Sequence, residues 1–170
     1  MNAHTTTPHR DWVQSAVQQY EGRLLRYAAQ ITHDVDRARD VVQDTFLALC
    51  RENPDVVEGH LAEWLYTVCR NRALDVQRKE KRMQTITAEQ TAAQASQEAG
   101  QAAVAERNDS AAQILRLVER LSANQREVVR LKFQNGLSYK EISRITELSV
   151  TNVGYLIHTA IQKLRQQVEL

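Results

Sequence analysis

Residues 138–164 read SYKEISRITELSVTNVGYLIHTAIQKL, and this stretch decides the fold. Ser138 and Glu141 have the spacing of a capping box at the start of a short helix, and Ser149 can cap a second, longer helix. Only Glu147 and Leu148 remain for a tight turn between the two. The pattern therefore predicts a helix-turn-helix unit.

Apolar side chains recur at helical spacing through this stretch, and we expect them to form the core between its helices. They are Ile142, Ile145, Leu148, Val150, Val153, Ile157, Ala160 and Leu164. The polar or aromatic residues between them would point outward on the second helix, where they are candidate base readers. These are Thr151, Asn152, Tyr155, His158, Thr159 and Gln162.

The residues just upstream also contain signals for the start and the end of a helix. Ser122 and Gln125 form a second capping box, and Gly136 stands where a glycine commonly ends a helix. We therefore predict four helices in the C-terminal part, over about 111–120, 123–134, 139–146 and 150–167.

The N-terminal part predicts three further helices, over about 11–31, 36–50 and 60–82, separated by a break at 32–34 and a loop at 53–59. Each has an apolar stripe. The first carries Val13, Val17, Tyr20, Leu24, Ala28 and Ile31; the second carries Ala38, Val41, Val42, Thr45, Phe46 and Leu49; the third carries Leu61, Leu65, Val68 and Leu74.

Residues 83–110 are rich in Ala, Gln, Thr, Ser and Glu, with few large apolar side chains to offset the entropy of ordering. We predict an all-α protein of two small helical domains. Residues 1–10 would be a disordered tail, 11–82 the first domain, 83–110 a flexible linker and 111–170 the second domain.

Several classes of function lack the residues they need. Cys50 and Cys69 have no CxxC or His spacing of a zinc site and are predicted to be small core residues. No phosphate loop or nucleophile motif is present, so we expect no enzymatic activity, metal, cofactor or small-molecule substrate. Without a run of about 20 apolar residues or an apolar signal core, we expect a cytoplasmic protein with no membrane insertion.

Four motifs, taken in order, resemble an extracytoplasmic-function (ECF) sigma factor of the sigma-70 family. DRARDVVQDTFLAL (36–49) and EWLYTVCRNRALDVQRK (63–79) resemble sigma domain two, and LSANQREVVR (121–130) and LSYKEIS (137–143) resemble sigma domain four. The resemblance implies promoter recognition and transcription initiation, with core RNA polymerase and promoter DNA as partners. It also admits an anti-sigma factor as a third partner.

By this resemblance, the second helix would dock on the polymerase clamp through Asp40, Gln43, Asp44 and Phe46. The third helix, with the loop before it, would melt and hold the −10 element, and Asn71 occupies the family position near a flipped base. This role requires cations that bind the backbone of a separated strand, and flat or hydrogen-bonding side chains that hold its exposed bases. The candidates are Trp64, Arg70, Asn71, Arg72, Arg78, Lys79 and Arg82.

The resemblance places the final helix in the major groove at the −35 element. The candidates there are Lys140, Arg144, Ser149, Thr151, Asn152, Tyr155 and His158. One departure concerns Gly154, Leu156 and Thr159, because the family usually carries Arg or Lys at these positions. Lys140, Arg144, Lys163 and Arg165 would then have to position the duplex. The linker would pass through the polymerase near the RNA exit path.

Two alternatives remain open at this point. A two-component regulator could carry a similar C-terminal domain, but its receiver needs alternating strands and helices, and the first hundred residues show no strand pattern. A sigma-like helical adaptor would bind polymerase or an antagonist without directing initiation. The few cations on the last helix are consistent with that adaptor.

Overall fold

The computed structural model describes residues 6–90 and 109–168, and all regular structure in these two ranges is helical. The helices form two compact units. Unit 1 contains α1 (Thr6–Thr32), α2 (Val35–Leu49), the single turns α3 (Pro54–Val57) and η1 (Glu58–His60), and α4 (Leu61–Gln90). Unit 2 contains α5 (Asp109–Glu119), α6 (Ala123–Val129) with a π turn η2 (Arg130–Gln134), α7 (Tyr139–Thr146) and α8 (Val150–Val168). The predicted all-α class is confirmed.

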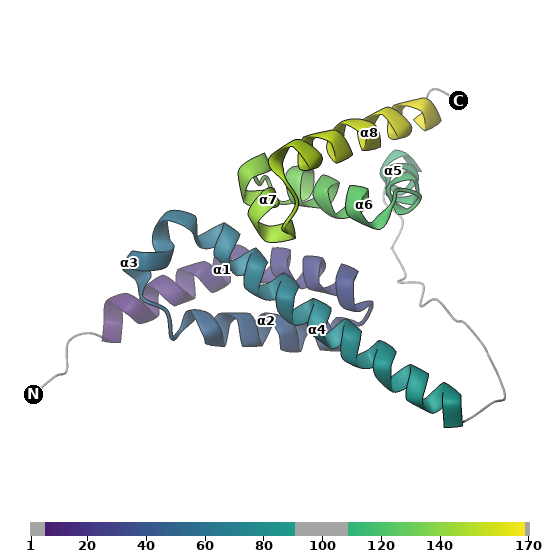
Figure 1. The fold of residues 1–170 in the computed structure, drawn as a ribbon. Coiled ribbons are helices and arrows are strands. Elements are labelled where there is room, and N and C mark those ends of the chain that lie inside the picture. The colour runs from purple at the N-terminus through teal and green to yellow at the C-terminus, as the bar shows by residue number, and fades with distance from the viewer. Residues whose placement is uncertain (1–5, 91–108, 169–170) are drawn as a thin grey trace, which may run out of the picture. The chain divides into compact units, whose positions relative to one another are not determined.

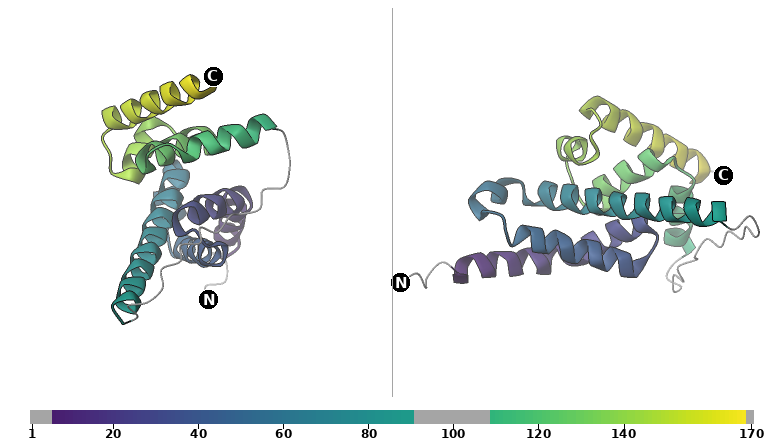
Figure 2. Two further views of the ribbon diagram at one scale, coloured as in Figure 1. Left: turned by 90° about the vertical axis from the view of Figure 1, so that its right-hand side faces the viewer. Right: turned by 60° about the horizontal axis from the view of Figure 1, so that its bottom comes forward.

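In unit 1, α1, α2 and α4 lie side by side around one core (Figures 1 and 2). The six residues predicted for the inner face of α2 are the six that are buried. Leu24 and Ala28 of α1 and Leu65 of α4 are also buried, as the apolar stripes predicted. The stripes missed Tyr27 and Tyr66, whose rings meet edge to face with centroids 5.3 Å apart.

The corner between α1 and α2 forms where the break was predicted. His33 adopts a left-handed backbone with φ 55°, and Asp34 then caps α2 by accepting a hydrogen bond from the Arg37 backbone N–H at 3.0 Å. The predicted loop at 53–59 is instead two short helical turns. The reason is local: Asn53 is an N-cap followed by Pro54, whose fixed φ suits the first helical position.

Both ends of unit 1 are more helical than predicted. The predicted tail (1–10) already contains the first turn of α1, where Pro8 is tolerated and His9 donates from Nε2 to the Cys50 carbonyl at 3.0 Å. The predicted linker (83–110) begins with the last eight residues of α4, because extending a formed helix avoids the cost of nucleation. The predicted linker also ends later than α5 begins, because α5 starts at Asp109; residues 1–5 and 91–108 lie outside the described residues.

Two residues predicted to be buried are exposed. Cys50 follows the last inner position of α2 and caps its end at the surface, whereas Cys69 is fully buried as predicted. Val150 opens α8 and remains 44% exposed, while its neighbours in the predicted core, such as Val153 and Ile157, are buried.

The local signals in unit 2 are confirmed. Both capping boxes form, and Ser149 accepts from the Asn152 N–H at 3.1 Å to start α8. Gly136 has φ +67°, and the Leu137 N–H beyond it returns to the Leu131 carbonyl at 3.2 Å. The turn before α8 places Glu147 in the left-handed region, with φ 61°.

The two glycines of unit 2 should respond to alanine in opposite ways. A Cβ on Gly154 would lie 3.6 Å from Tyr139 Cε2, an ordinary contact, so Gly154→Ala is expected to stabilise unit 2 by about 0.5–1 kcal/mol. Gly136→Ala would force a side chain into the left-handed region and should destabilise it by about 1–2 kcal/mol. Calorimetric melting of both variants checks the pair, and equal shifts in melting temperature would contradict it.

The core of unit 1 predicts a loss of stability at alkaline pH. Burial raises the pKa of the Cys69 thiol from 9.0 to about 12, and burial also raises the pKa of Tyr66. At pH 8 the thiol is almost wholly neutral in the folded and unfolded states, so its contribution is nearly complete. As the pH rises through 9, the thiol ionises in the unfolded chain and stays neutral in the folded one. Ionisation of this thiol in the unfolded chain should therefore lower the free energy of unfolding by about 2 kcal/mol between pH 8 and pH 10.5.

Urea unfolding at the two pH values, followed by tryptophan fluorescence, measures this loss, because both tryptophans, Trp12 and Trp64, belong to unit 1. The matched variant Cys69→Ala should lose about 2 kcal/mol less than the parent over the same interval. An equal loss in both proteins would show that the thiol does not ionise on unfolding as described.

Candidate nucleic-acid interface

One face of α4 carries a row of candidate DNA-binding residues. Trp64, Asn71 and Arg78 are seven residues apart, and Arg82 follows one turn later, so the four lie on the same side of the helix. Asn71, Arg78 and Arg82 are exposed, and Trp64 is half-buried. We call these four residues the α4 row; at 1.5 Å per residue it is about 27 Å long. This length and these groups suit an extended strand.

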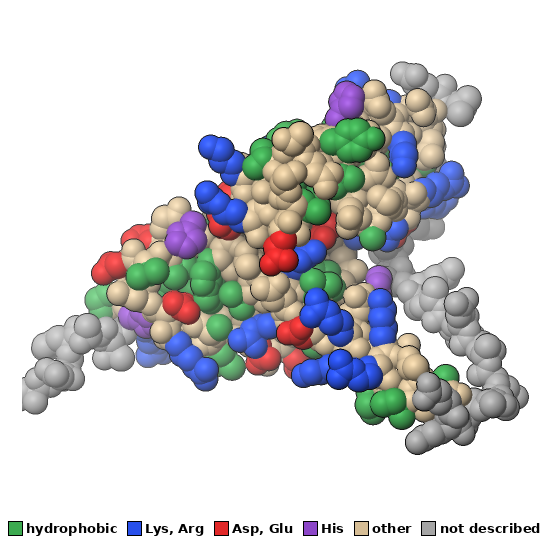
Figure 3. All heavy atoms as spheres, viewed as in Figure 1, with side chains coloured by type: hydrophobic (Ala, Val, Ile, Leu, Met, Phe, Trp, Pro, Cys, Tyr) green, Lys and Arg blue, Asp and Glu red, His purple; other side chains and the backbone are tan. Residues whose placement is uncertain are grey.

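The α4 row is not uniformly positive. Asp75 lies on the same face and pairs with Arg78 at 3.1 Å, with both side chains more than 60% exposed. Such a pair is weak in water, and a phosphate can displace its carboxylate. Figure 3 shows Lys and Arg side chains gathered along the C-terminal half of α4, where residues 78, 79, 81 and 82 are all exposed cations.

The other predicted −10 residues flank the row. Arg72 and Lys79 share one flank, and half-buried Arg70 lies on the other. Arg72 reaches toward α2, where its Nη1 lies 3.8 Å from Asp44 Oδ2. A predicted DNA contact and a predicted polymerase contact are therefore neighbours.

The exposed face of α2 brings together three of the four residues predicted to bind polymerase. Asp40, Gln43 and Asp44 are exposed, and Leu47, which sequence reasoning missed, joins them with 57% of its surface exposed. We call these four residues the α2 surface. Phe46 does not belong to it: only 9% exposed, it packs in the core, as its place in the apolar stripe requires.

In unit 2, the outward face of α8 carries a second row, the α8 row, of Thr151, Tyr155, His158 and Gln162. All four are exposed, Tyr155 to 65%, and they recur at i, i+4, i+7 and i+11. Asn152 is exposed beside them. Ser149 is exposed too, but its Oγ is engaged as the cap of α8. The row offers hydroxyl, imidazole and amide groups that can bond to base edges.

Thr159 was expected to point outward and instead faces α6. Its Oγ1 accepts a hydrogen bond from Gln125 Nε2 at 2.9 Å and donates to the Tyr155 carbonyl at 3.0 Å. Gln125 is 5% exposed, and its Oε1 also accepts from Lys163 Nζ at 3.2 Å. Gln125, the capping-box partner of Ser122 in α6, therefore also binds α8, and Lys163 is engaged in that contact.

The cations that could hold a duplex in unit 2 lie on α7, just before it, and near the end of α8, where Arg165 is exposed. Lys140 and Arg144 are exposed one turn apart on α7. Lys132, which sequence reasoning did not single out, lies over the Tyr139 ring with Nζ 5.3 Å from its centroid. Helix α7 packs against α8, and within the α8 row itself there is no Lys or Arg.

Two further arginines of unit 2, Arg126 and Arg130, form ion pairs and hydrogen bonds within the unit. Glu119 at the end of α5 binds Arg126 at 3.2 Å and Arg130 at 2.6 Å, and Arg126 also donates to the Glu119 and Leu121 carbonyls. Burial lowers the pKa of Arg130, and Glu119 opposes that shift. These arginines fasten α5 to α6 and do not add to a DNA-binding surface.

Within residues 6–90 and 109–168, no group of three or more His, Cys, Asp or Glu side chains could hold a metal ion. The helices of the same two ranges include none with the length and apolarity needed to span a bilayer.

Comparison with known proteins places both units in one family. The family model "Sigma-70 region 2" matches residues 16–83, and "Sigma-70, region 4" matches residues 111–164. RNA polymerase sigma factor YlaC of Bacillus subtilis is 25% identical, with 94% of each chain covered. ECF RNA polymerase sigma factor SigM of the same organism is 28% identical over 87% of this chain and 90% of its own.

A solved structure supports the fold. The sigma factor RpoE of Bartonella quintana, crystallised with the anti-sigma factor NepR, aligns with a TM-score of 0.66 over 92% of this chain and 96% of its own, at 21% identity.

Proposed function

The chain belongs to the sigma-70 family as an ECF sigma factor, and from this premise we propose how its surfaces divide the work of initiation. The α2 surface binds core RNA polymerase, the α4 row holds the melted strand of the −10 element, and the α8 row reads the −35 duplex. We further propose that the protein works in the cytoplasm, where polymerase acts, and is not an enzyme.

The observation that carries the proposal is the chemical difference between the two rows. The α4 row combines an aromatic ring, an amide and two guanidinium groups, which suit unpaired bases and a single-strand backbone. The α8 row contains no Lys, Arg, Asp or Glu and lies on the second helix of a helix-turn-helix, whose first helix, α7, carries the exposed Lys140 and Arg144. This suits base readout in a major groove with phosphates held from the side.

Transcription with purified components tests the proposal. The protein is mixed with sigma-free core polymerase and a library of genomic fragments, and the starts of the transcripts are mapped. We expect defined starts that share a −10 and a −35 element. Binding to core without any specific start would favour the adaptor.

An anti-sigma factor is a third proposed partner. RpoE of Bartonella quintana was crystallised with the anti-sigma factor NepR, and the two proteins share the fold. Such an antagonist would block initiation by covering the α2 surface, the α4 row or the α8 row.

A further inference from the structure

Glu80 interrupts the basic run at the C-terminal half of α4. The run reads Arg78-Lys79-Glu80-Lys81-Arg82, and its four cations are exposed, whereas Glu80 is half-buried. At about 100° per residue, Glu80 points roughly 200° away from Arg78, toward the inner side of the helix. Gln77, one turn earlier on this inner side, donates from Nε2 to the Ile31 carbonyl at 3.0 Å.

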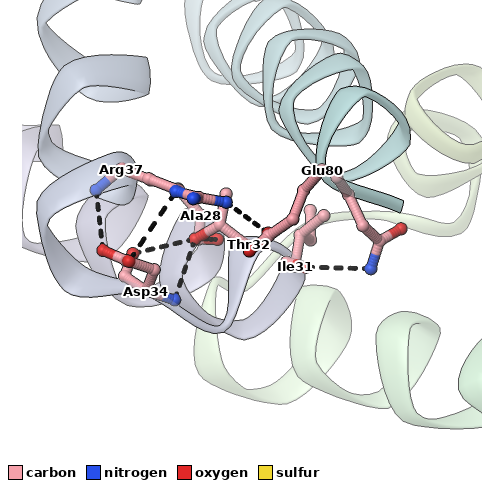
Figure 4. A network of polar contacts seen from close by, with 7 residues as sticks. Ala28, Ile31, Thr32, Asp34, Arg37 and Glu80 are labelled. Carbon is pink, nitrogen blue, oxygen red and sulfur yellow. Dashed lines mark hydrogen bonds and ion pairs between the residues drawn. The ribbon is translucent and has the colours of Figure 1, made fainter. Parts of the chain in front are cut away.

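The Glu80 carboxylate is bound by Arg37 of α2, as Figure 4 shows. The Arg37 side chain is 42% exposed and that of Glu80 is 31% exposed. Because the two residues come from different helices, the pair joins the start of α2 to the middle of the basic run.

Arg37 is held in place from its other side. Its backbone N–H donates to Asp34 Oδ1 at 3.0 Å, and its Nε lies 3.7 Å from Asp34 Oδ2. The Thr32 hydroxyl oxygen in turn lies 2.9 Å from the Asp34 carbonyl oxygen and 3.0 Å from the Ala28 carbonyl oxygen, so that its one proton is shared between them. The corner between α1 and α2 thus presents a guanidinium group to α4 in a set position.

We propose that Arg37 is a positioning residue for DNA binding. It neutralises Glu80 and holds the carboxylate away from the phosphates, so that Glu80 does not offset the four cations of the run; the other nearby carboxylate, Asp75, pairs with Arg78. The physical reason is that an unpaired carboxylate within about 8 Å of a phosphate repels it with little screening. The inference rests on the proposed function, because it requires phosphates along α4.

Four variants test the proposal in the holoenzyme: Arg37→Ala, Glu80→Gln, the double variant, and Arg39→Ala as a matched control. Arg39 is also on α2 but pairs with Asp36 at 3.1 Å on the same helix. The readout is affinity for a forked DNA carrying the −10 element, by fluorescence anisotropy. Core binding and urea unfolding are measured for each variant.

We expect Arg37→Ala to weaken DNA binding about 2–5-fold, the upper part of the range for an exposed charge pair. Glu80→Gln should bind as tightly as the parent or more tightly, the double variant should match Glu80→Gln, and Arg39→Ala should change affinity less than twofold. Core binding should not change. This rescue by removal of the carboxylate is a result that a purely structural role would not produce.

Three results would overturn the proposal. A double variant as weak as Arg37→Ala would mean that Arg37 itself contacts DNA or polymerase. Equal weakening by Glu80→Gln and Arg37→Ala would mean that the pair acts through packing. An Arg37→Ala variant with the DNA affinity of the parent would mean that Glu80 does not repel the phosphates. Failure of the proposed function looks different: the variant Arg78→Ala/Arg82→Ala would then also leave DNA binding unchanged.

Discussion

Replacing Phe46 with alanine is expected to lower the free energy of unfolding of unit 1 by about 3–5 kcal/mol. The ring is 9% exposed and belongs to the buried face of α2, together with Val42 and Leu49, so its removal leaves a cavity in the core of unit 1. Because small domains are stable by only about 5–15 kcal/mol, this loss would partly unfold unit 1. Urea unfolding followed by tryptophan fluorescence measures it.

The neighbouring residue provides a matched control. Leu47 is 57% exposed, so Leu47→Ala should change the free energy of unfolding by no more than about 0.5 kcal/mol. Binding to core polymerase should show the opposite ranking of the two positions. Phe46→Leu, a milder change that keeps the protein folded, should bind core like the parent. Leu47→Ala should bind core more weakly because it alters the α2 surface. A folded Phe46→Leu variant that fails to bind core would instead make Phe46 a direct contact.

The second large effect is expected at Asn71. This side chain lies in the middle of the α4 row, about 10 Å along the helix from both Trp64 and Arg78, and its amide can donate to and accept from a base edge. Loss of one base contact is worth about 1–3 kcal/mol, so Asn71→Ala should slow the formation of the open promoter complex about 5–150-fold. Permanganate reactivity of unpaired thymines measures the opening.

The control for Asn71 is Gln84→Ala, which removes another exposed amide from α4 on a different side of the helix. It should leave promoter opening within twofold of the parent. Asn71→Ala should also lose the preference for one base of the −10 element. If it opened promoters at the parent rate with unchanged preference, the α4 row would not be the site of base capture.

Most of the fold could be predicted because its signals are local. The inner face of α2, both capping boxes and the turn at Glu147 each depend on residues within a few positions of one another. The helix ends at Thr6 and Gln90 differ from the prediction for two separate reasons. One depends on a contact between His9 and the distant Cys50, and the other on continuation of a helix already formed.

The candidate site was only partly predictable. For Phe46, periodicity indicated the core while the family resemblance indicated polymerase, and the structure favours the core. Thr159 lies at the border between outward and inward faces, where its hydrogen bond with Gln125 decides its role. The pair between Arg37 and Glu80 joins residues far apart in the sequence, so spacing could not reveal it.

The most direct test of the central claim, that the two rows hold two different promoter elements, is site-specific photocrosslinking. A benzophenone amino acid is placed at position 71 in one variant and at 155 in another, and each is assembled with core polymerase on a mapped promoter. We expect position 71 to crosslink to the unpaired strand of the −10 element and position 155 to the −35 duplex. The account would be contradicted if position 155 formed no crosslink at the −35 element, or if position 71 crosslinked only to duplex DNA.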